Sequence, residues 1–410
     1  MQVMASLVVL GLCFMVLAVE PDGAYGSSRG SLAGNSAAAA APVTNGICAI
    51  SVTTHGYKCE EHELKTDDGY ILNMQRIPEG RVGGSRGGQP VLIQHGIFAD
   101  AITWLLNSPE QNLPMILADN GFDVWISNTR GTRFSQKHIS LNPVQPEFWD
   151  WSWDELVAYD LPAFFGYVFN QTGQKIHYIG HSLGTLMAMA SFSEGHQADM
   201  LQSAALLSPI AYLSHMKTAL VVLAAKAFVG EIATMFGLAE FNPKGPEVSA
   251  FLKDLCDNPG VNCYDLVSAI SGKNCCLNAS TIDFALQNEP QSTATKNLVH
   301  LAQIVRDGVI KKYDYGNPDD NMKHYGEAKP PVYNISNIDR ELRLFISYGG
   351  LDALSDVEDV GLLLDLLKLH DVNKLSIQNI KDYAHLDFIM GVNAKDMVYN
   401  QVVKFFKYQQ

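Results

Sequence analysis

The chain has 410 residues, of which 47% are hydrophobic and 18% are charged, a composition typical of a globular protein rather than a disordered one. Its formal net charge of −14 argues against nucleic acid as a partner and against binding to an anionic bilayer by electrostatic attraction alone. Beyond the N-terminus no apolar stretch is long enough to cross a bilayer, so the mature protein is expected to have no transmembrane segment.

The N-terminal residues are typical of a targeting segment. An apolar run from Ala5 to Val19 predicts that residues 1–19 are a signal peptide. Residues 20–46 are rich in Gly, Ser and Ala, cannot form a packed core, and are predicted to be a linker or a removed pro-segment. Entry into the secretory pathway predicts a secreted protein or one in the vacuolar or lysosomal lumen. It also makes three sequons candidate glycosylation sites, at Asn170, Asn278 and Asn334.

Seven cysteines occur, and one of them lies in the predicted signal peptide. The other six are Cys48, Cys59, Cys256, Cys263, Cys275 and Cys276. An even number in an oxidising compartment permits disulfides, and the grouping favours Cys48 with Cys59 and local pairs among the other four. At least one disulfide is expected among those four, with Cys256–Cys263, across a short loop, as the favoured pair. Adjacent cysteines rarely bond to each other, so Cys275 and Cys276 are each expected to face outward. Zinc is the rival interpretation, but no C-x-x-C spacing or nearby histidine pair supports it, and no metal or other cofactor is expected.

Strand-like and helix-like segments alternate along much of the chain. Residues 61–78 predict a hairpin around the turn Asp67-Asp68-Gly69. Further apolar strands are predicted at residues 91–94, 122–127, 204–207, 342–347 and 374–377. Near-continuous apolar strands separated by helical segments predict an α/β fold with a mostly parallel sheet covered on both faces.

Residues 180–184 read Gly-His-Ser-Leu-Gly, the pattern G-x-S-x-G. The preceding residues 175–179 are apolar and β-prone, and the Ala-, Leu- and Met-rich residues that follow favour a helix. A serine at such a strand-to-helix turn is typical of the nucleophile elbow of an α/β-hydrolase, where small residues on either side keep strand and helix from colliding. Ser182 is therefore the predicted nucleophile. The alternative is a tight turn without chemistry.

Between residues 209 and 331 the alternation stops. The predicted organisation is an α/β-hydrolase core of residues 47–208 and 332–410, with an inserted, mainly helical cap or lid domain of residues 209–331. Within this insertion Ala219–Val229 predicts an apolar helix that is too short to span a bilayer. That helix is either buried in the cap, or it lines an acyl tunnel or faces lipid.

The other catalytic residues are expected in the order acid, then histidine. The acid belongs on the loop after the strand at 342–347, where Asp352 is the first carboxylate. Asp356 and Asp359 are rivals, but their neighbours predict the start of a helix, where capping and the helix dipole explain an acidic side chain. The base belongs on the loop after the last strand, a placement that only His385 has among the histidines.

These residues predict acyl transfer by a serine nucleophile. His385 would take the proton from Ser182 as it attacks an ester carbonyl and return it to the leaving alcohol. Asp352 would orient the imidazole and stabilise its charged form.

Neighbouring residues are expected to support this chemistry. The backbone N–H groups of Leu183 and Ile97 are the predicted oxyanion donors. His181 is expected to point away from the site and to serve packing, and Asp387 is expected to have a structural role.

Taken together, the motifs resemble those of the acid lipases of the α/β-hydrolase superfamily, the group that contains gastric and lysosomal acid lipases, and more closely their plant triacylglycerol-lipase relatives. The resemblance rests on residues 55–57, 61–63, 66–72, 94–96, 121–131, 148–153, 180–184, 312–316, 349–352 and 385–388. It implies hydrolysis of acyl esters of neutral lipids, without a cofactor, in a site gated by a lid. Leu183 stands where the animal digestive members have glutamine, a difference that bears on the pocket lining and substrate preference.

Two hypotheses from different classes follow. The first is a lipase acting on a lipid ester at an oil–water or membrane interface. The alternative is an α/β-hydrolase scaffold that binds a lipid without turnover, or a transferase that passes the acyl group to an alcohol instead of water. The presence of all three predicted catalytic residues favours the first.

Overall fold

The computed structural model describes residues 46–81, 87–245 and 263–408. The predicted signal peptide, nearly all of the predicted linker and Cys256 lie outside these residues, as does the side chain of Cys263. The predicted Cys256–Cys263 pairing therefore stays a prediction. No helix in the described part of the chain is long and apolar enough to span a bilayer.

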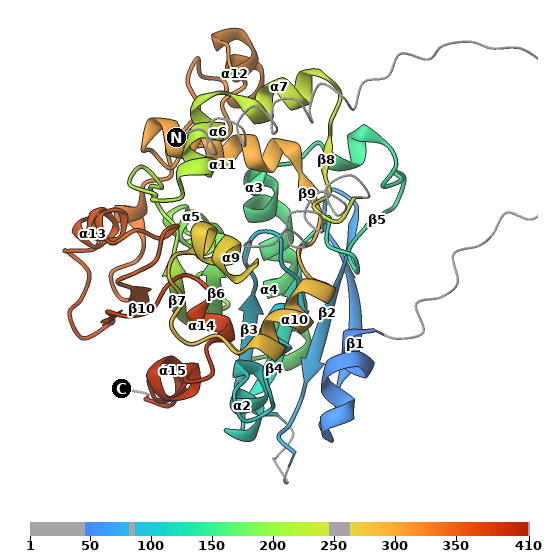
Figure 1. Ribbon diagram of the computed structural model, residues 1–410, viewed down its shortest axis with the longest axis vertical. Coiled ribbons are helices and arrows are strands. Elements are labelled where there is room, and N and C mark those ends of the chain that lie inside the picture. The colour runs from blue at the N-terminus through green and yellow to red at the C-terminus, as the bar shows by residue number, and fades with distance from the viewer. Residues whose placement is uncertain (1–45, 82–86, 246–262, 409–410) are drawn as a thin grey trace, which may run out of the picture. The chain divides into compact units, whose positions relative to one another are not determined.

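A nine-stranded sheet forms the centre of the described protein (Figure 1). Its strands are β1 (Glu60–Lys65), β2 (Tyr70–Ile77), β3 (Pro90–Gln94), β4 (Asp123–Asn128), β5 (Lys137–His138), β6 (Ile176–Ser182), β7 (Leu201–Pro209), β10 (Arg343–Gly349) and β11 (Leu375–Ile380). Their order is β1-β2-β4-β3-β6-β7-β10-β11, with β5 paired to β2. β1, β2 and β5 pair antiparallel, and the strands from β4 to β11 pair in parallel. The sheet is thus mostly parallel, as the sequence predicts.

Both faces of the sheet are covered, which explains its apolar strands. Leu92 and Tyr178 point into one buried cluster, whereas their neighbours Ile93 and Ile179 point into another. The helices of the core are α2 (Leu113–Asp119), α3 (Trp153–Glu155), α4 (Leu161–Thr172), α5 (Leu183–Ser193), α13 (Val357–Leu366), α14 (Asp387–Met390) and α15 (Asn400–Lys407). α4 and α5 belong to the first cluster and α2 and α15 to the second. Because successive strand residues face opposite sides, a strand buried on both sides carries hardly any polar position.

The segment between β7 and β10 is mainly helical, as predicted. Within its described residues, the elements are α6 (Ala219–Lys226), α7 (Val229–Met235), β8 (Glu240–Phe241), α9 (Cys263–Ser271), α10 (Ala279–Asn288), β9 (Thr293–Ala294), α11 (Thr295–Asp307) and α12 (Pro318–Tyr325). Figure 1 shows α6, α7 and α11 beyond the upper ends of the parallel strands. This is the end of the sheet where the chain leaves β3, β6 and β10, and where the predicted catalytic residues lie.

The apolar run Ala219–Val229 is not one helix. α6 ends at Lys226 and α7 begins at Val229, because Phe228 adopts a left-handed conformation with φ 55°. Nor is the run fully buried, since the side chains of Leu223 and Phe228 are about half exposed, at 44% and 51%. Its outward face is therefore apolar, which disagrees with a helix buried in the cap.

Disulfides join Cys48 to Cys59 and Cys275 to Cys276. The first pair is the one that the sequence suggested. The second contradicts the expectation that the adjacent cysteines face outward separately. Their backbone N–H groups both donate to one buried carboxylate, that of Asp387. This contact fixes the backbone of the two cysteines, and local sequence does not specify it.

Candidate active site

Ser182 lies at the sharp turn between β6 and α5. Its φ of 54° and ψ of −121° are unusual for a residue with a side chain, and such strained geometry is typical of a nucleophile elbow. The two flanking positions must be glycine because there is no room for a side chain at either. A Cβ on Gly180 would lie 2.8 Å from the backbone of Gly184, and one on Gly184 would lie 2.9 Å from the Gln94 carbonyl oxygen. The elbow therefore has the packing that the motif predicts.

Asp352 follows β10 and is buried. Its Oδ1 accepts hydrogen bonds from the backbone N–H groups of Leu354 (2.9 Å) and Ser355 (2.8 Å), and its Oδ2 accepts one from the Ser208 hydroxyl (2.9 Å). These donors fix the plane of the carboxylate toward His385. Sequence reasoning did not identify Ser208, because it lies on β7, far from Asp352 in the chain.

The two rival carboxylates have structural partners instead. Asp356 caps α13 by accepting the backbone N–H of Glu358 at 2.9 Å. Asp359 accepts the hydroxyl of Ser214 at 2.9 Å and the backbone N–H of His215 at 3.0 Å. Capping therefore explains Asp356, as the sequence argument expected, whereas Asp359 lies in the first turn of α13 and binds Ser214 and His215.

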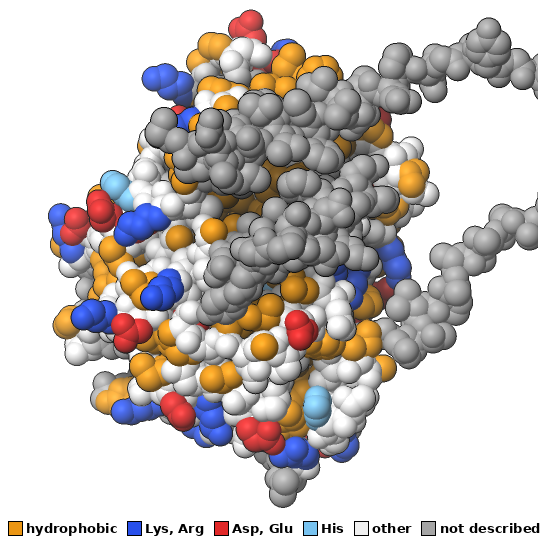
Figure 2. Space-filling model, viewed as in Figure 1, with side chains coloured by type: hydrophobic (Ala, Val, Ile, Leu, Met, Phe, Trp, Pro, Cys, Tyr) orange, Lys and Arg blue, Asp and Glu red, His pale blue; other side chains and the backbone are white. Residues whose placement is uncertain are grey.

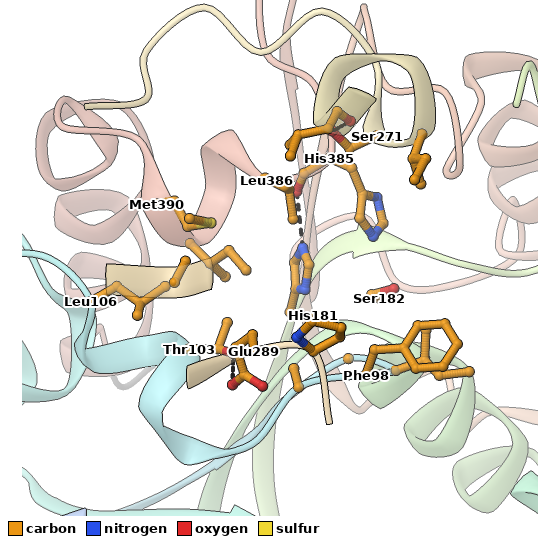
Figure 3. A pocket seen from close by; sticks show the side chains of 18 of the residues that line it. Phe98, Thr103, Leu106, His181, Ser182, Ser271, Glu289, His385, Leu386 and Met390 are labelled. Carbon is orange, nitrogen blue, oxygen red and sulfur yellow. Dashed lines mark hydrogen bonds between the residues drawn. The ribbon is translucent and has the colours of Figure 1, made fainter. Parts of the chain in front are cut away.

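His385 lies on the loop between β11 and α14, with its Nδ1 2.9 Å from Oδ2 and 3.1 Å from Oδ1 of Asp352. Because the carboxylate accepts, Nδ1 carries a hydrogen and Nε2 keeps its lone pair. Nε2 is buried and has no hydrogen-bond partner among the described residues. Figure 3 shows the His385 ring above Ser182 on one side of the pocket that both residues line. The arrangement suits proton transfer from the serine to Nε2.

His181 differs from its prediction, because it lines the pocket instead of pointing away. Its Nε2 lies 3.0 Å from the backbone carbonyl oxygen of His385, and the two rings are 4.8 Å apart (Figure 3). Burial, aided by the nearby His385, holds the pKa of His181 well below its usual range. The ring is therefore neutral and donates to the carbonyl, so that it holds the backbone of the predicted base.

The loop after β3 approaches the nucleophile closely. A Cβ on Gly96 would lie 2.8 Å from Cβ of Ser182. The next residue, Ile97, lines the pocket, and Leu183 is the first residue of α5. Both predicted oxyanion donors thus lie on segments adjacent to Ser182.

The pocket has a volume of about 300 Å³ and is largely apolar. Its lining comes from three parts of the chain: the loops of the core, the insertion, and the loop of His385 with α14. The apolar side chains from the insertion are Val267, Ile270, Leu277, Ile282 and Leu286, and those from the core include Ile97, Phe98, Leu106, Leu386, Ile389 and Met390. Such a lining favours an acyl chain over a polar ligand.

Among the described residues that line this apolar pocket, one has a carboxyl group, Glu289, just after α10. Its Oε1 accepts the backbone N–H of Asp100 at 3.0 Å and the Thr103 hydroxyl at 2.7 Å (Figure 3). Its Oε2 is buried without a hydrogen-bond partner among the described residues. Burial, with the charge of Asp100, raises the pKa of Glu289 to about 8. No motif pointed to this residue.

One described cluster has side chains of the kinds that bind metals, Cys275, Cys276 and Asp387, with ligand atoms within 4.8 Å of one another. A metal takes the thiolate form of cysteine, and the two sulfurs here are joined to each other. The three predicted catalytic residues need no metal for acyl transfer.

Comparisons with known proteins show the family to which the fold belongs. Residues 89–385 match the family model for the alpha/beta hydrolase fold, and residues 49–108 match that for a partial alpha/beta-hydrolase lipase region. Triacylglycerol lipase 2 of Arabidopsis thaliana is 59% identical over 100% of this chain and 99% of its own length. Gastric triacylglycerol lipase of Homo sapiens is 36% identical, covering 86% of this chain and 88% of its own.

Solved structures resemble the fold. A soluble variant of the monoglyceride lipase from Saccharomyces cerevisiae superposes with a TM-score of 0.53 and 12% identity, covering 84% of this chain and 94% of that one. A lipase in an open form gives a TM-score of 0.53 at 15% identity, covering 85% and 98%. At such identities the likeness concerns the fold alone.

Proposed function

The chain belongs to the lipase family of the α/β-hydrolases, and from that premise we propose that it hydrolyses carboxylic esters of neutral lipids through an acyl-enzyme on Ser182. One observation carries the proposal. His385 binds Asp352 through Nδ1, and its Nε2 has no hydrogen-bond partner in the part of the chain that the structure describes, next to a strained serine in an apolar pocket (Figure 3).

The chemistry follows from the positions of these atoms. Nε2 of His385 takes the hydroxyl proton as Oγ of Ser182 attacks the ester carbonyl, and Asp352 stabilises the imidazolium that forms. The N–H groups of Ile97 and Leu183 donate to the oxyanion. His385 then returns the proton to the leaving alcohol. Water, activated by the same imidazole, releases the fatty acid.

The pocket lining supports a lipid substrate. Burial of an acyl chain gains about 0.8 kcal/mol for each methylene group, so rates are expected to rise with chain length until the pocket is full. Triacylglycerols are the proposed substrates, since the proteins most like this one in sequence, among those given above, are named for them.

The insertion is proposed to act as a lid. It supplies much of the pocket lining, and α6, α7 and the residues after them expose apolar side chains to the outside: Val221, Leu223, Phe228, Ile232, Met235, Phe236 and Leu238. Figure 2 shows hydrophobic side chains at this end of the molecule. A lipid surface covers such a face, whereas water does not. Activity is therefore expected to rise when the substrate forms an emulsion.

We also propose passage through the secretory pathway. The disulfide between Cys48 and Cys59 fits an oxidising compartment. The predicted glycosylation sites Asn170, Asn278 and Asn334 are all exposed. Asn278 and Asn334 cap helices through Oδ1, and a glycan would be attached at Nδ2, which in Asn334 also donates to Oδ1 of Asn337 at 3.2 Å.

A panel of esters tests the function. The full chain should hydrolyse emulsified medium- and long-chain triacylglycerols faster than soluble acetate esters, and the Ser182→Ala variant should hydrolyse neither. Acetate esterase activity without activity on emulsions would indicate a small-ester hydrolase. Tight lipid binding without turnover would favour the binding scaffold, and acyl transfer to added alcohol in preference to water would favour a transferase.

A further inference from the structure

The segment of residues 271–277, from the last residue of α9 toward α10, is hydrogen-bonded directly to the loops of the acid and the base. The Ser271 carbonyl oxygen accepts the backbone N–H of His385 at 3.1 Å and that of Ala353, next to the acid, at 3.4 Å. Oδ1 of Asn274 accepts the N–H of Leu386 at 3.1 Å. The insertion therefore supports His385 from outside the core.

The Cys275–Cys276 pair is the centre of this contact. Cys275 N–H donates to Oδ2 of Asp387 and Cys276 N–H to Oδ1, each at 3.1 Å. Oδ2 also accepts the N–H of Ala384 at 2.8 Å, and the Cys276 carbonyl accepts the N–H of Val392 at 2.8 Å. The carboxylate thus clamps the residues on both sides of His385 to the cysteine pair.

The buried carboxylate of Asp387 is stabilised by these N–H donors. Its side chain is fully buried, and burial raises its pKa while the N–H groups of Ala384, Cys275 and Cys276 lower it. A buried carboxylate that loses hydrogen bonds is destabilised. Movement of the cysteine pair would therefore release Asp387 and, with it, the loop of His385.

We propose that the Cys275–Cys276 disulfide is a positioning element for His385, and that opening this disulfide lowers turnover. The bond closes a small ring around the peptide link between the cysteines and so restricts the backbone that presents both N–H groups. The inference rests on the proposed function, because it takes His385 as the base. A dithiol reductant opens the bond by giving two electrons and two protons, which yields two thiols and the oxidised, cyclic form of the reductant.

The other described disulfide offers a matched control. Cys275 is exposed, so a reductant reaches it, whereas Cys48 in the Cys48–Cys59 pair is buried. The hydrogen bonds described above, which hold the loop of His385, do not involve Cys48 or Cys59. Loss of that pair should reduce stability and leave the turnover of the folded enzyme unchanged.

The experiment begins with non-reducing peptide mapping of the full chain, which should find Cys275 joined to Cys276. The double variant Cys275→Ser/Cys276→Ser is then compared with Cys48→Ser/Cys59→Ser on an emulsified triacylglycerol. The first should lose kcat by about 10- to 100-fold with KM nearly unchanged, because small displacements of a catalytic group cost this much. The second should keep its kcat. Mild reduction of the native chain should reproduce the loss, and reoxidation should restore it.

Labelling of Ser182 by a fluorophosphonate gives a readout independent of lipid binding. Its rate should fall with kcat in the Cys275→Ser/Cys276→Ser variant, since the reagent also needs a serine activated by His385. Equal kcat and labelling in the native chain and that variant would overturn the inference while leaving the function intact. Mapping that joins Cys275 or Cys276 to another cysteine would also overturn it. A native chain that hydrolyses no ester would overturn both proposals.

Discussion

Glu289 is expected to make the stability of the protein depend on pH, and replacement by glutamine should remove that dependence. Glutamine keeps an oxygen that accepts the hydrogen bonds from Asp100 and Thr103, but it does not ionise. The native carboxyl group lies near Asp100, which pairs with Arg133 at 2.8 Å. Lys244 also interacts electrostatically with Glu289. Ionisation would therefore place a second negative charge beside Asp100 in a buried site.

The size of the effect follows from the change in pKa. Burial, with the charge of Asp100, raises the pKa of Glu289 from 4.5 to about 8. Between these values the folded chain holds a proton that the unfolded chain has released. The stabilisation is thus fully present below the unfolded pKa, and it is lost as the pH rises toward and through the folded one. Each rise of one pH unit in this window lowers the free energy of unfolding by about 1.4 kcal/mol. Between about pH 5 and pH 7.5 the loss is roughly 3 kcal/mol.

Urea unfolding of the native chain and the Glu289→Gln variant at these two pH values measures the effect. The free energy of unfolding of the native chain, relative to the variant, should be lower at the higher pH by roughly 3 kcal/mol. A Glu147→Gln variant, changed at an exposed position, should show no such difference. If the stabilities of the native chain and Glu289→Gln change in parallel with pH, the reasoning about Glu289 is wrong.

Three further predictions concern catalysis. Ser182→Ala should fold normally and lose on the order of 10⁴- to 10⁶-fold in esterase kcat, which a titration of released acid would measure; a smaller loss would point to another nucleophile. Asp352→Asn should lower the esterase kcat by a factor on the order of 10⁴, while Asp356→Asn should lower it little. If Asp356→Asn has the larger effect in the same assay, Asp356 is the acid. Phe228→Asp should reduce the rise in rate between dissolved and emulsified substrate more than it reduces acetate hydrolysis, and equal reductions would contradict a role for α6 and α7 at the lipid surface.

Local patterns were enough to predict the sheet and the place of each catalytic candidate. The strands are marked by apolar runs, and the turn at Ser182 by glycines that the close approach of strand and helix requires. The order of serine, acid and histidine then left Asp352 and His385 as the residues at the ends of the right strands. The structure brings these two together, and local reasoning reached them because each lies directly after a strand.

The features that sequence reasoning missed depend on contacts between distant segments. The direction of His181 is set by the carbonyl of His385, and the pairing of Cys275 with Cys276 accompanies their contact with Asp387. The raised pKa of Glu289 is caused by burial and by the charge of Asp100. No pattern of neighbouring residues encodes these contacts, so only the folded arrangement revealed them.

The central claim is that Ser182 carries the acyl group during turnover. Mixing the full chain with a slowly deacylated lipid ester, quenching with acid and mapping the peptides by mass spectrometry tests it directly. The account predicts one acyl group on the peptide that contains Ser182, and none in the Ser182→Ala variant. An acyl group on a different residue, or undiminished hydrolysis by Ser182→Ala, would contradict it.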